Sequence, residues 1–366
     1  MPLAIYRKYR PKTFKELIGQ EPIIEILQNA AKNDKIGHAY LFYGPRGSGK
    51  TTLARIMAKV VNCETRDSDN QFKKKGEPCN KCRPCLEIDE GKALDVIEID
   101  AASNRGIDEI RNLKEGIRLS PTSYKYKVFI IDECHQLTKE ASNALLKTLE
   151  EPPSHAIFIL ATTEFEKIPT TIISRTQRFN FKKLSKNKIL QKLKNVVEVE
   201  KIKIDEISLE LIATAAEGSF RDAESLLDQV ILLGNGDLST VEQILGKIGF
   251  SKTAELAGLI LKGELEESLE FLSKINEGGY NLIQLNHDII HYLRRVLVLS
   301  FDPKMEKIFE EELTLEELKQ LKEHSKICQP EKHIILLKSL IRAYSEMKYS
   351  PFAIIPLEVA IIENLK

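Results

Sequence analysis

The segment from Gly44 to Thr51 constrains the fold of this chain more than any other. Its letters, GPRGSGKT, match the pattern G-x-x-x-x-G-K-[ST] at every specified position. An apolar run at 40–43 precedes it and a helical pattern at 51–61 follows it, which is the strand–loop–helix context that this phosphate-binding loop requires. Glycines let backbone N–H groups surround phosphate oxygens, and the helix adds its positive end. The sequence therefore predicts an α/β domain that binds a nucleoside triphosphate.

Further apolar runs indicate the other strands of that domain. Together with the first run they lie at 40–43, 96–99, 128–131, 156–161 and 178–181. Runs that are apolar on both faces are typical of parallel strands covered by helices on both sides. The sequence thus predicts a parallel sheet.

The strand signals end near residue 182. Three helical patterns follow, up to about residue 237. Only helical periodicity is present from 238 to the end, and its longest stretch lies at 281–300. We therefore expect a nucleotide-binding domain at 1–180, a three-helix domain at 181–240 and an all-α domain at 241–366.

Two carboxylates, Asp132 and Glu133, directly follow the predicted strand at 128–131. The carboxyl ends of parallel strands form the ligand crevice, so Asp132 is expected to hold the Mg²⁺ that Thr51 also ligates. Glu133 is then expected to polarise the attacking water, and Lys50 to reach the β- and γ-phosphates. Paired acids alone would more often be a solvated strand end. Combined with the phosphate loop, they indicate ATP hydrolysis by in-line attack of water. The loop residues expected to contact ATP are Gly44, Pro45, Arg46, Gly47, Ser48, Gly49, Lys50, Thr51 and Thr52.

The charges of the chain balance. Lysine plus arginine and aspartate plus glutamate both number 54. No overall positive field attracts nucleic acid, so any such contact must come from a local patch. No apolar run approaches the roughly 18 residues of a membrane span, and the first residues lack the apolar core of a secretory signal. We expect a cytoplasmic protein without membrane contact, in which cysteines are reduced.

Four of the six cysteines are clustered in the sequence. They follow the spacing C-x15-C-x2-C-x2-C and comprise Cys63, Cys79, Cys82 and Cys85. Four thiolates match tetrahedral zinc, although a C-x2-C-x2-C run also occurs in iron–sulfur proteins. Zinc is favoured because no redox partner motif accompanies the cluster. The insert 63–85 is expected to be an exposed zinc knuckle, and Cys134 and Cys328 to be isolated, buried or half-buried thiols.

Several stretches together resemble the gamma/tau subunit family of bacterial DNA polymerase III, the ATPase of the sliding-clamp loader. They lie at 6–21, 38–55, 100–111, 128–153, 159–179 and 218–229. The resemblance is dense over 1–245 and weaker through the helical C-terminal third. It implies an AAA+ module with a parallel sheet, a three-helix lid and a helical collar.

The resemblance also implies partners and a reaction cycle. The chain is expected to form a ring with copies of itself and with other loader subunits of the delta and delta-prime types. ATP binding is expected to open the sliding clamp and to grip primer–template DNA. Hydrolysis then releases the clamp on DNA for DNA polymerase III, the nucleotidyltransferase of the complex.

The resemblance assigns further roles by motif. Thr162 resembles the sensor that contacts the γ-phosphate or the water, Arg175 the finger supplied to a neighbouring subunit, and Arg221 the lid sensor. Thr176 stands where the family typically has a cysteine. Residues that resemble the pocket for the nucleotide base are Arg7, Tyr9, Arg10, Pro11, Ile18 and Gly19.

The sequence around Arg221 supports its predicted role independently of the resemblance, whereas the sequence around Arg175 does not. The segment SFRD, at 219–222, predicts a helix start with Ser219 as the N-cap. Arginine in a first turn opposes the helix dipole by about 0.3–1 kcal/mol, which a γ-phosphate would offset; a solvated arginine is the alternative. Arg175 ends a predicted helix, where a positive charge is favourable, so its finger role rests on the resemblance.

A DNA-contacting face is one interpretation of the stretch 103–119. Arg111, Lys114 and Arg118 share one side of a predicted helix, with Asn104 and Arg105 at its entry. These residues could follow phosphates without reading base sequence. A solvated charged stripe is an equally good interpretation.

Two other functions remain as alternatives. DECH, at 132–135, suggests a DNA helicase or branch-migration motor, but no second RecA-like half and no arginine-rich helicase motif follow residue 180. We therefore interpret His135 as incidental, packing near the strand end. A non-hydrolysing scaffold subunit is disfavoured because the residues of the phosphate loop and the paired acids are all intact.

Overall fold

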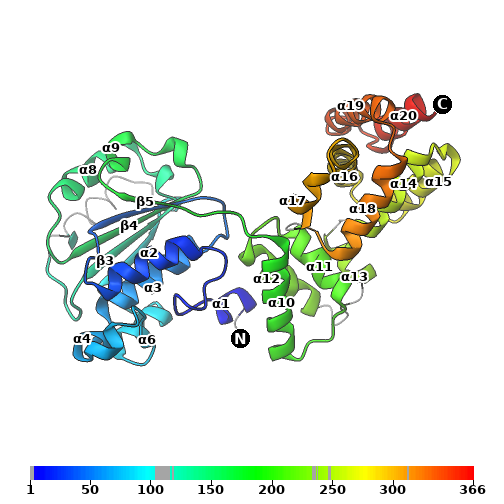
Figure 1. The fold of residues 1–366 in the computed structure, drawn as a ribbon. Coiled ribbons are helices and arrows are strands. Elements are labelled where there is room, and N and C mark those ends of the chain that lie inside the picture. The colour runs from blue at the N-terminus through cyan, green and yellow to red at the C-terminus, as the bar shows by residue number, and fades with distance from the viewer. Residues whose placement is uncertain are drawn as a thin grey trace. The chain divides into compact units, whose positions relative to one another are not determined.

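The protein is described here by a computed structural model (Figure 1). The described residues are 4–103, 116–117, 119–232, 236, 238–245, 249–310 and 313–366. The chain divides into two compact units: residues 1–184 with 219–221, and residues 185–218 with 222–366. Each unit is described by itself.

A five-stranded parallel sheet forms the centre of the first unit, with strand order β2-β3-β4-β1-β5. Its strands are β1 (Ala39–Tyr43), β2 (Val96–Asp100), β3 (Lys127–Asp132), β4 (Ala156–Thr162) and β5 (Gln177–Asn180). All five predicted strands are confirmed. Because β4 lies between β1 and β3, the carboxyl ends of these three strands meet at one edge of the sheet.

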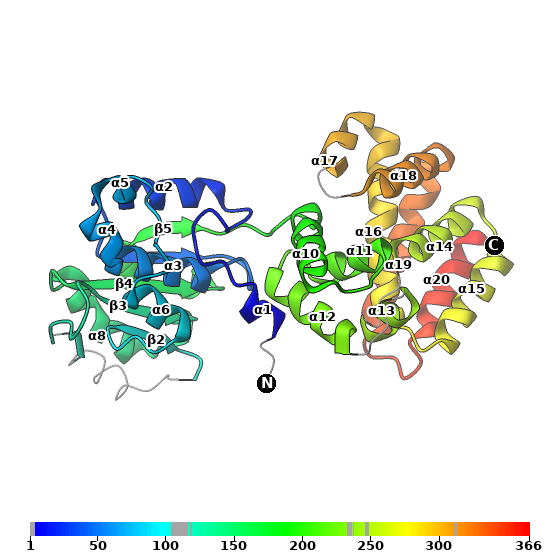
Figure 2. The ribbon, with the colours of Figure 1, turned by 90° about the horizontal axis from the view of Figure 1, so that it is seen from below.

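Helices cover both faces of this sheet (Figures 1 and 2). One face packs against α2 (Glu21–Lys32), α3 (Lys50–Asn62) and α6 (Arg83–Glu90), and the other against α8 (Lys139–Glu150) and α9 (Thr170–Ile173). Strand side chains alternate between the two cores: Tyr40 and Phe42 enter the first, Ala39 and Leu41 the second. Both faces are therefore apolar, which explains the continuous hydrophobic runs in the sequence.

Short elements complete the first unit. They are α1 (Ile5–Lys8), α4 (Glu64–Ser68), α5 (Asn70–Lys73) and the 3₁₀ turns η1 (Cys134–Gln136) and η2 (Phe165–Lys167).

The second unit is helical throughout its described residues. It contains α10 (Lys186–Glu200), α11 (Glu206–Ala215), α12 (Phe220–Leu232), α13 (Leu238–Leu245), α14 (Phe250–Lys262), α15 (Leu265–Glu277), α16 (Leu282–Phe301), η3 (Pro303–Met305), α17 (Glu306–Glu310), α18 (Leu315–Ile327), α19 (Pro330–Met347) and α20 (Ile354–Leu365). The first three helices were predicted, as was α16. One core gathers buried residues of α14, α15, α16, α18, α19 and α20.

The division into two compact units does not test where each of the three predicted domains begins and ends. The first unit ends at Leu184, close to the boundary predicted at 180. The predicted lid and collar lie together in the second unit, and their division at 240 stays a prediction. Among the described residues, no helix has the length and apolar character needed to cross a bilayer.

A buried carboxylate fixes the loop that leads into β3. Asp95 is 1% exposed and accepts hydrogen bonds from the backbone N–H groups of Thr122, Ser123 and Tyr124, at 2.8, 2.7 and 2.9 Å. Replacing it by alanine would remove the shared acceptor of three backbone N–H groups and leave a cavity at a buried position.

We predict that Asp95→Ala lowers the free energy of unfolding by about 2–4 kcal/mol. Urea denaturation followed by circular dichroism measures the loss, and amide hydrogen exchange in β2 and β3 locates it. The exposed Glu90→Ala, in the same part of the unit, is the control and should change stability by less than about 0.5 kcal/mol. Equal free energies of unfolding for the two variants would contradict the conclusion that Asp95 fixes the loop before β3.

Candidate nucleotide-binding site and cysteine cluster

The phosphate loop leaves β1 and enters α3 through glycines that other residues could not replace. Gly44 has φ 142°, and a Cβ there would lie 2.2 Å from the Phe181 carbonyl oxygen. Gly47 has φ 71°, and a Cβ there would lie 1.8 Å from the Ser219 Oγ. Both the backbone conformation and the close neighbours therefore require glycine.

Lys50 begins α3 and is buried, with 6% exposure. Its Nζ donates to the carbonyl oxygens of Gly44 and Pro45, both at 2.8 Å. Burial lowers the pKa of Lys50, and the carboxylates of Glu133 and Asp132 oppose that shift. The ammonium group thus stays within the loop, where phosphate oxygens could replace its two carbonyl acceptors.

The other loop residues surround this lysine. The Ser48 hydroxyl donates to the Pro45 carbonyl oxygen at 2.8 Å and closes the turn. Arg46 is exposed, and Thr52 is half-buried on α3.

Thr51 and Asp132 meet across the end of β4. The Thr51 hydroxyl donates to Asp132 Oδ2 at 2.7 Å, and the Glu133 backbone N–H donates to Asp132 Oδ1 at 3.0 Å. A hydroxyl and a carboxylate are the hard oxygen ligands that Mg²⁺ prefers, so this pair fits a magnesium ion that also contacts phosphate. The two predicted magnesium ligands are thus brought together.

Glu133 sits at a turn after β3, and its carboxylate contacts Thr163, which directly follows β4. Its backbone is left-handed, with φ 47° and ψ 43°. Its Oε2 accepts hydrogen bonds from both the backbone N–H and the hydroxyl of Thr163, at 3.1 and 2.9 Å. Thr163 was not singled out in the sequence, because its role depends on the register between β3 and β4.

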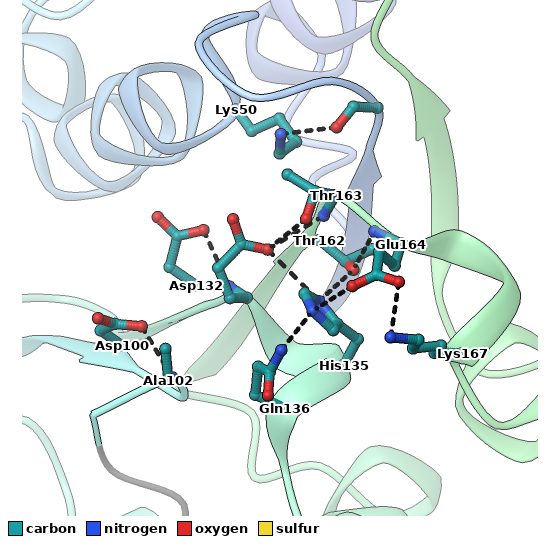
Figure 3. A network of polar contacts seen from close by, with 12 residues as sticks. Lys50, Asp100, Ala102, Asp132, His135, Gln136, Thr162, Thr163, Glu164 and Lys167 are labelled. Carbon is teal, nitrogen blue, oxygen red and sulfur yellow. Dashed lines mark hydrogen bonds and ion pairs between the residues drawn. The ribbon is translucent and has the colours of Figure 1, made fainter. Parts of the chain in front are cut away.

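His135 lies beside Thr162 (Figure 3), and its ring also lies close to Glu133. Its Nδ1 lies 3.0 Å from the Thr162 hydroxyl and 3.4 Å from Glu133 Oε2. Its Nε2 lies 3.1 Å from Glu164 Oε1 and 2.9 Å from the Gln136 side-chain nitrogen. The expectation that His135 packs near the strand end is confirmed. Its interpretation as incidental to helicase chemistry stays a prediction, and the structure adds that η1 turns the imidazole back into the polar cluster.

Thr162 is the buried centre of this cluster. It is fully buried at the end of β4, and its hydroxyl also accepts the Glu164 backbone N–H at 3.0 Å. The hydroxyl therefore lies beside Glu133 and close to the crevice edge.

Gln20 ties the N-terminal segment to the phosphate loop. It is 4% exposed, and its side-chain nitrogen donates to the carbonyl oxygens of Ser48 at 3.4 Å and Lys182 at 2.9 Å. Its oxygen accepts the Lys182 backbone N–H at 3.2 Å. No motif marks Gln20 in the sequence, although this residue lies in the resembling stretch 6–21.

The residues expected to receive the base lie on α1 and the turns after it. Tyr9, Arg10, Pro11, Ile18 and Gly19 are half-buried, and Arg7 is exposed. Burial lowers the pKa of Arg10, and the neighbouring Arg55 adds to that shift.

Tyr6 connects two of the predicted arginines. Arg7 Nε donates to the Tyr6 hydroxyl at 3.1 Å, and the Arg221 guanidinium lies 5.3 Å from the ring centre. Arg221 is the second residue of α12 and belongs, with Ser219, to the first unit. Tyr6 carries no motif signal of its own beyond its position in the resembling stretch.

Arg175 lies away from the phosphate loop. It follows α9, where its Nη1 donates to the Thr171 carbonyl oxygen at 2.8 Å and its Nη2 to Glu150 Oε1 at 2.5 Å. It lines a shallow depression beside Ala39, which begins β1, whereas the phosphate loop follows the other end of that strand. The structure therefore does not bring Arg175 to the site of its own chain.

The four clustered cysteines converge. Their Sγ atoms all lie within 4.8 Å of one another, and the pairs Cys79–Cys85 and Cys63–Cys82 are 4.0 Å apart. Tetrahedral zinc with bonds of about 2.3 Å requires sulfurs about 3.8 Å apart. The arrangement therefore fits zinc.

Hydrogen bonds lower the pKa of Cys63 and of Cys79, whereas burial raises the pKa of Cys82 and the hydrogen bond with Cys63 raises that of Cys85. The backbone N–H groups of Lys81 and Cys82 donate to Cys79 Sγ at 3.3 and 3.2 Å. A hydrogen bond with the Cys85 thiol lowers the pKa of Cys63 to about 5. Cys63 is then a thiolate at neutral pH, which is the form that ligates metals.

The two cysteines outside the cluster have the burial that was expected, and the predicted DNA-contacting residues are not described by the structure. Cys134 is buried and Cys328 half-buried, as expected. The predicted DNA-contacting residues Asn104, Arg105, Arg111, Lys114 and Arg118 lie outside the described residues.

The parallel sheet, the phosphate loop after β1 and the paired acids after β3 define a nucleotide-binding fold of the P-loop class. Three family models match consecutive parts of the chain. They are "DNA polymerase III, delta subunit" over 19–185, "DNA polymerase III clamp loader subunit, ATPase lid domain" over 188–236 and "DNA polymerase III subunits gamma and tau domain III" over 237–365.

Several proteins that are similar to this chain are named as gamma or tau subunits of DNA polymerase III. The chain is 43% identical to DNA polymerase III subunit tau of Bacillus subtilis over 98% of this chain and 62% of that protein. It is 37% identical to subunit gamma of Buchnera aphidicola over 97% and 96%, and 35% identical to subunit tau of Escherichia coli over 99% and 55%. The chain belongs to the DNA polymerase III gamma/tau family. It spans little more than half the length of the two tau proteins.

We predict that the purified chain binds one zinc ion through the cysteine cluster. The double variant Cys79→Ser/Cys82→Ser should lose that ion, because two of four ligands are removed. Elemental analysis measures zinc per chain, and Cys328→Ser, which alters a cysteine outside the cluster, is the control. Iron with visible absorption in the wild type would instead indicate an iron–sulfur cluster.

Proposed function

We propose that this chain is the ATP-hydrolysing motor subunit of a replicative clamp loader. The observation that carries the proposal is the hydrogen bond between Thr51 and Asp132, beside Glu133, in a chain that matches gamma/tau relatives along almost its whole length. An intact hydrolytic site distinguishes a motor from a scaffold subunit.

Each residue of the site has a distinct role in the proposed hydrolysis of ATP. The backbone N–H groups of the loop and the Lys50 ammonium bind the β- and γ-phosphates. Thr51 and Asp132 would hold Mg²⁺, which would supply positive charge that offsets the charge of the phosphates. Glu133 accepts a proton from the attacking water, and Thr162 orients the water or the γ-phosphate.

Thr163 orients Glu133 for this role. Both donors from Thr163 bind Oε2 of the carboxylate, so that Oε1 is the oxygen that we expect to accept the proton from water. Arg221 is expected to reach the γ-phosphate. The nucleotide base of ATP is expected to bind among Arg7, Tyr9, Arg10, Pro11, Ile18 and Gly19.

The partners follow from the family. Relatives named as gamma, tau and gamma/tau subunits of DNA polymerase III support assembly with other loader subunits. We propose a ring with copies of this chain and delta-type and delta-prime-type subunits, which opens a sliding clamp and places it on primer–template DNA for DNA polymerase III. This reaction belongs to the cytoplasm, where bacterial DNA is replicated. The cysteine cluster holds structural zinc.

The experiment that tests the function is ATP hydrolysis by the chain with companion subunits, a sliding clamp and primed DNA. A motor subunit should be stimulated several-fold by clamp and DNA together. A helicase or branch-migration motor would unwind or move DNA without a clamp. A scaffold subunit would not hydrolyse ATP at all.

We predict that Lys50→Ala raises the dissociation constant for ATP by about 100-fold or more, because a buried ammonium that binds two phosphates is removed. Calorimetry or a fluorescent ATP analogue measures the affinity. Lys35→Ala, an exposed change near the opposite end of β1, is the control. Tight binding by Lys50→Ala would contradict the assigned site.

We predict that Arg175→Ala leaves ATP binding nearly unchanged but slows hydrolysis in the assembled loader by about 1,000-fold or more. The reason is that Arg175 lies away from its own loop and is proposed to serve a neighbouring subunit. Arg178→Ala, an exposed arginine on β5, is the control. Normal clamp loading by the Arg175 variant would remove the finger role.

A further inference from the structure

The segment between α1 and α2, residues 9–20, has no helix or strand, yet it is firmly held. Phe14 is 1% exposed within the first core. The segment carries most of the residues proposed to receive the base, and at its end Gln20 reaches Ser48 of the phosphate loop. Its backbone must therefore be fixed by side chains from elsewhere.

Glu77 supplies one such anchor. Its Oε2 accepts the Phe14 backbone N–H at 2.8 Å, and its Oε1 accepts the Lys15 backbone N–H at 3.1 Å. Gln28 of α2 also donates to Oε1 at 3.1 Å. Glu77 lies two residues before Cys79, so its position depends on the cysteine cluster.

Lys59 supplies a second anchor. It is fully buried on α3, and its Nζ donates to the Lys12 carbonyl oxygen and to Asn80 Oδ1, both at 2.8 Å. It also pairs with Asp89 Oδ1 at 2.7 Å. Three acceptors from three segments compensate a buried ammonium, and removing any one of them is costly.

Both anchors depend on the cysteine module, which we define as residues 63–90. Asn80 stands between Cys79 and Cys82 with φ 55°, in the turn whose N–H groups bond Cys79 Sγ. Asp89 lies on α6, which begins next to Cys82 and packs beside α3 (Figure 2). A continuous series of contacts thus links the four sulfurs to residues 12–15 and on to the phosphate loop.

We infer that the cysteine module sets the affinity for the nucleotide base, with Glu77 and Lys59 as positioning residues that hold the segment 9–20 in its binding conformation. This inference rests on the proposed nucleotide site. A metal held by the four sulfurs fixes Glu77 and Asn80. Metal and nucleotide are therefore linked, and each raises the affinity for the other.

The test compares two ligands in the full chain: ATP, which has a base, and inorganic tripolyphosphate, which does not. Glu77→Gln replaces one of two acceptor oxygens at constant size, so ATP should bind about tenfold more weakly while tripolyphosphate binding is unchanged. Glu87→Gln is the matched control, because Glu87 lies in the same module but bonds Tyr124 and Arg83 instead of the N-terminal segment. It should bind both ligands as the wild type does.

Two readouts that do not depend on hydrolysis complete the test. Hydrogen exchange at the Phe14 and Lys15 amides should accelerate in Glu77→Gln and in chelator-treated wild type, but not in Glu87→Gln. ATP should also slow the loss of zinc to the chelator.

Unchanged exchange and unchanged ATP affinity would overturn the inference, as would equal weakening of ATP and tripolyphosphate. If the wild type bound neither ligand, the proposed function would fail, while exchange at residues 14 and 15 would still decide whether the module holds the segment.

Discussion

The hydrogen bond between the Thr51 hydroxyl and the Asp132 carboxylate is the constraint on which this architecture depends. The two residues come from loops after β1 and β3, and β4 lies between these strands. They can meet only if three parallel strands end at the same level. A sheet slipped by one residue would turn alternate side chains to the wrong face, so the buried runs that set the register also set the site.

Much of the fold could be predicted because it rests on local patterns. All five strands and the helices α3, α10, α11, α12 and α16 follow from apolar periodicity, and the phosphate loop has a fixed spacing. The cysteine spacing likewise predicted a cluster that the structure brings within ligand distance. In each case the residues that must meet are close in sequence or follow directly from strand ends.

The rest could not be predicted because it depends on register and on distant side chains. Thr163 contacts Glu133 across 30 positions, and Gln20 meets Lys182 across 162. The contacts of His135 could not be predicted because nothing in the letters DECH shows that a 3₁₀ turn directs its ring toward Thr162. Glu77 and Lys59 carry no motif, and only their buried partners reveal their importance.

The placement of Arg175 near one end of β1, with the phosphate loop at the other, has a consequence for assembly. If each arginine completes the next chain's reaction centre, the contact between chains is head-to-tail and not twofold symmetric. An open ring then has two unlike ends: one terminal chain holds ATP with no arginine facing it, and the other presents an arginine to no ATP.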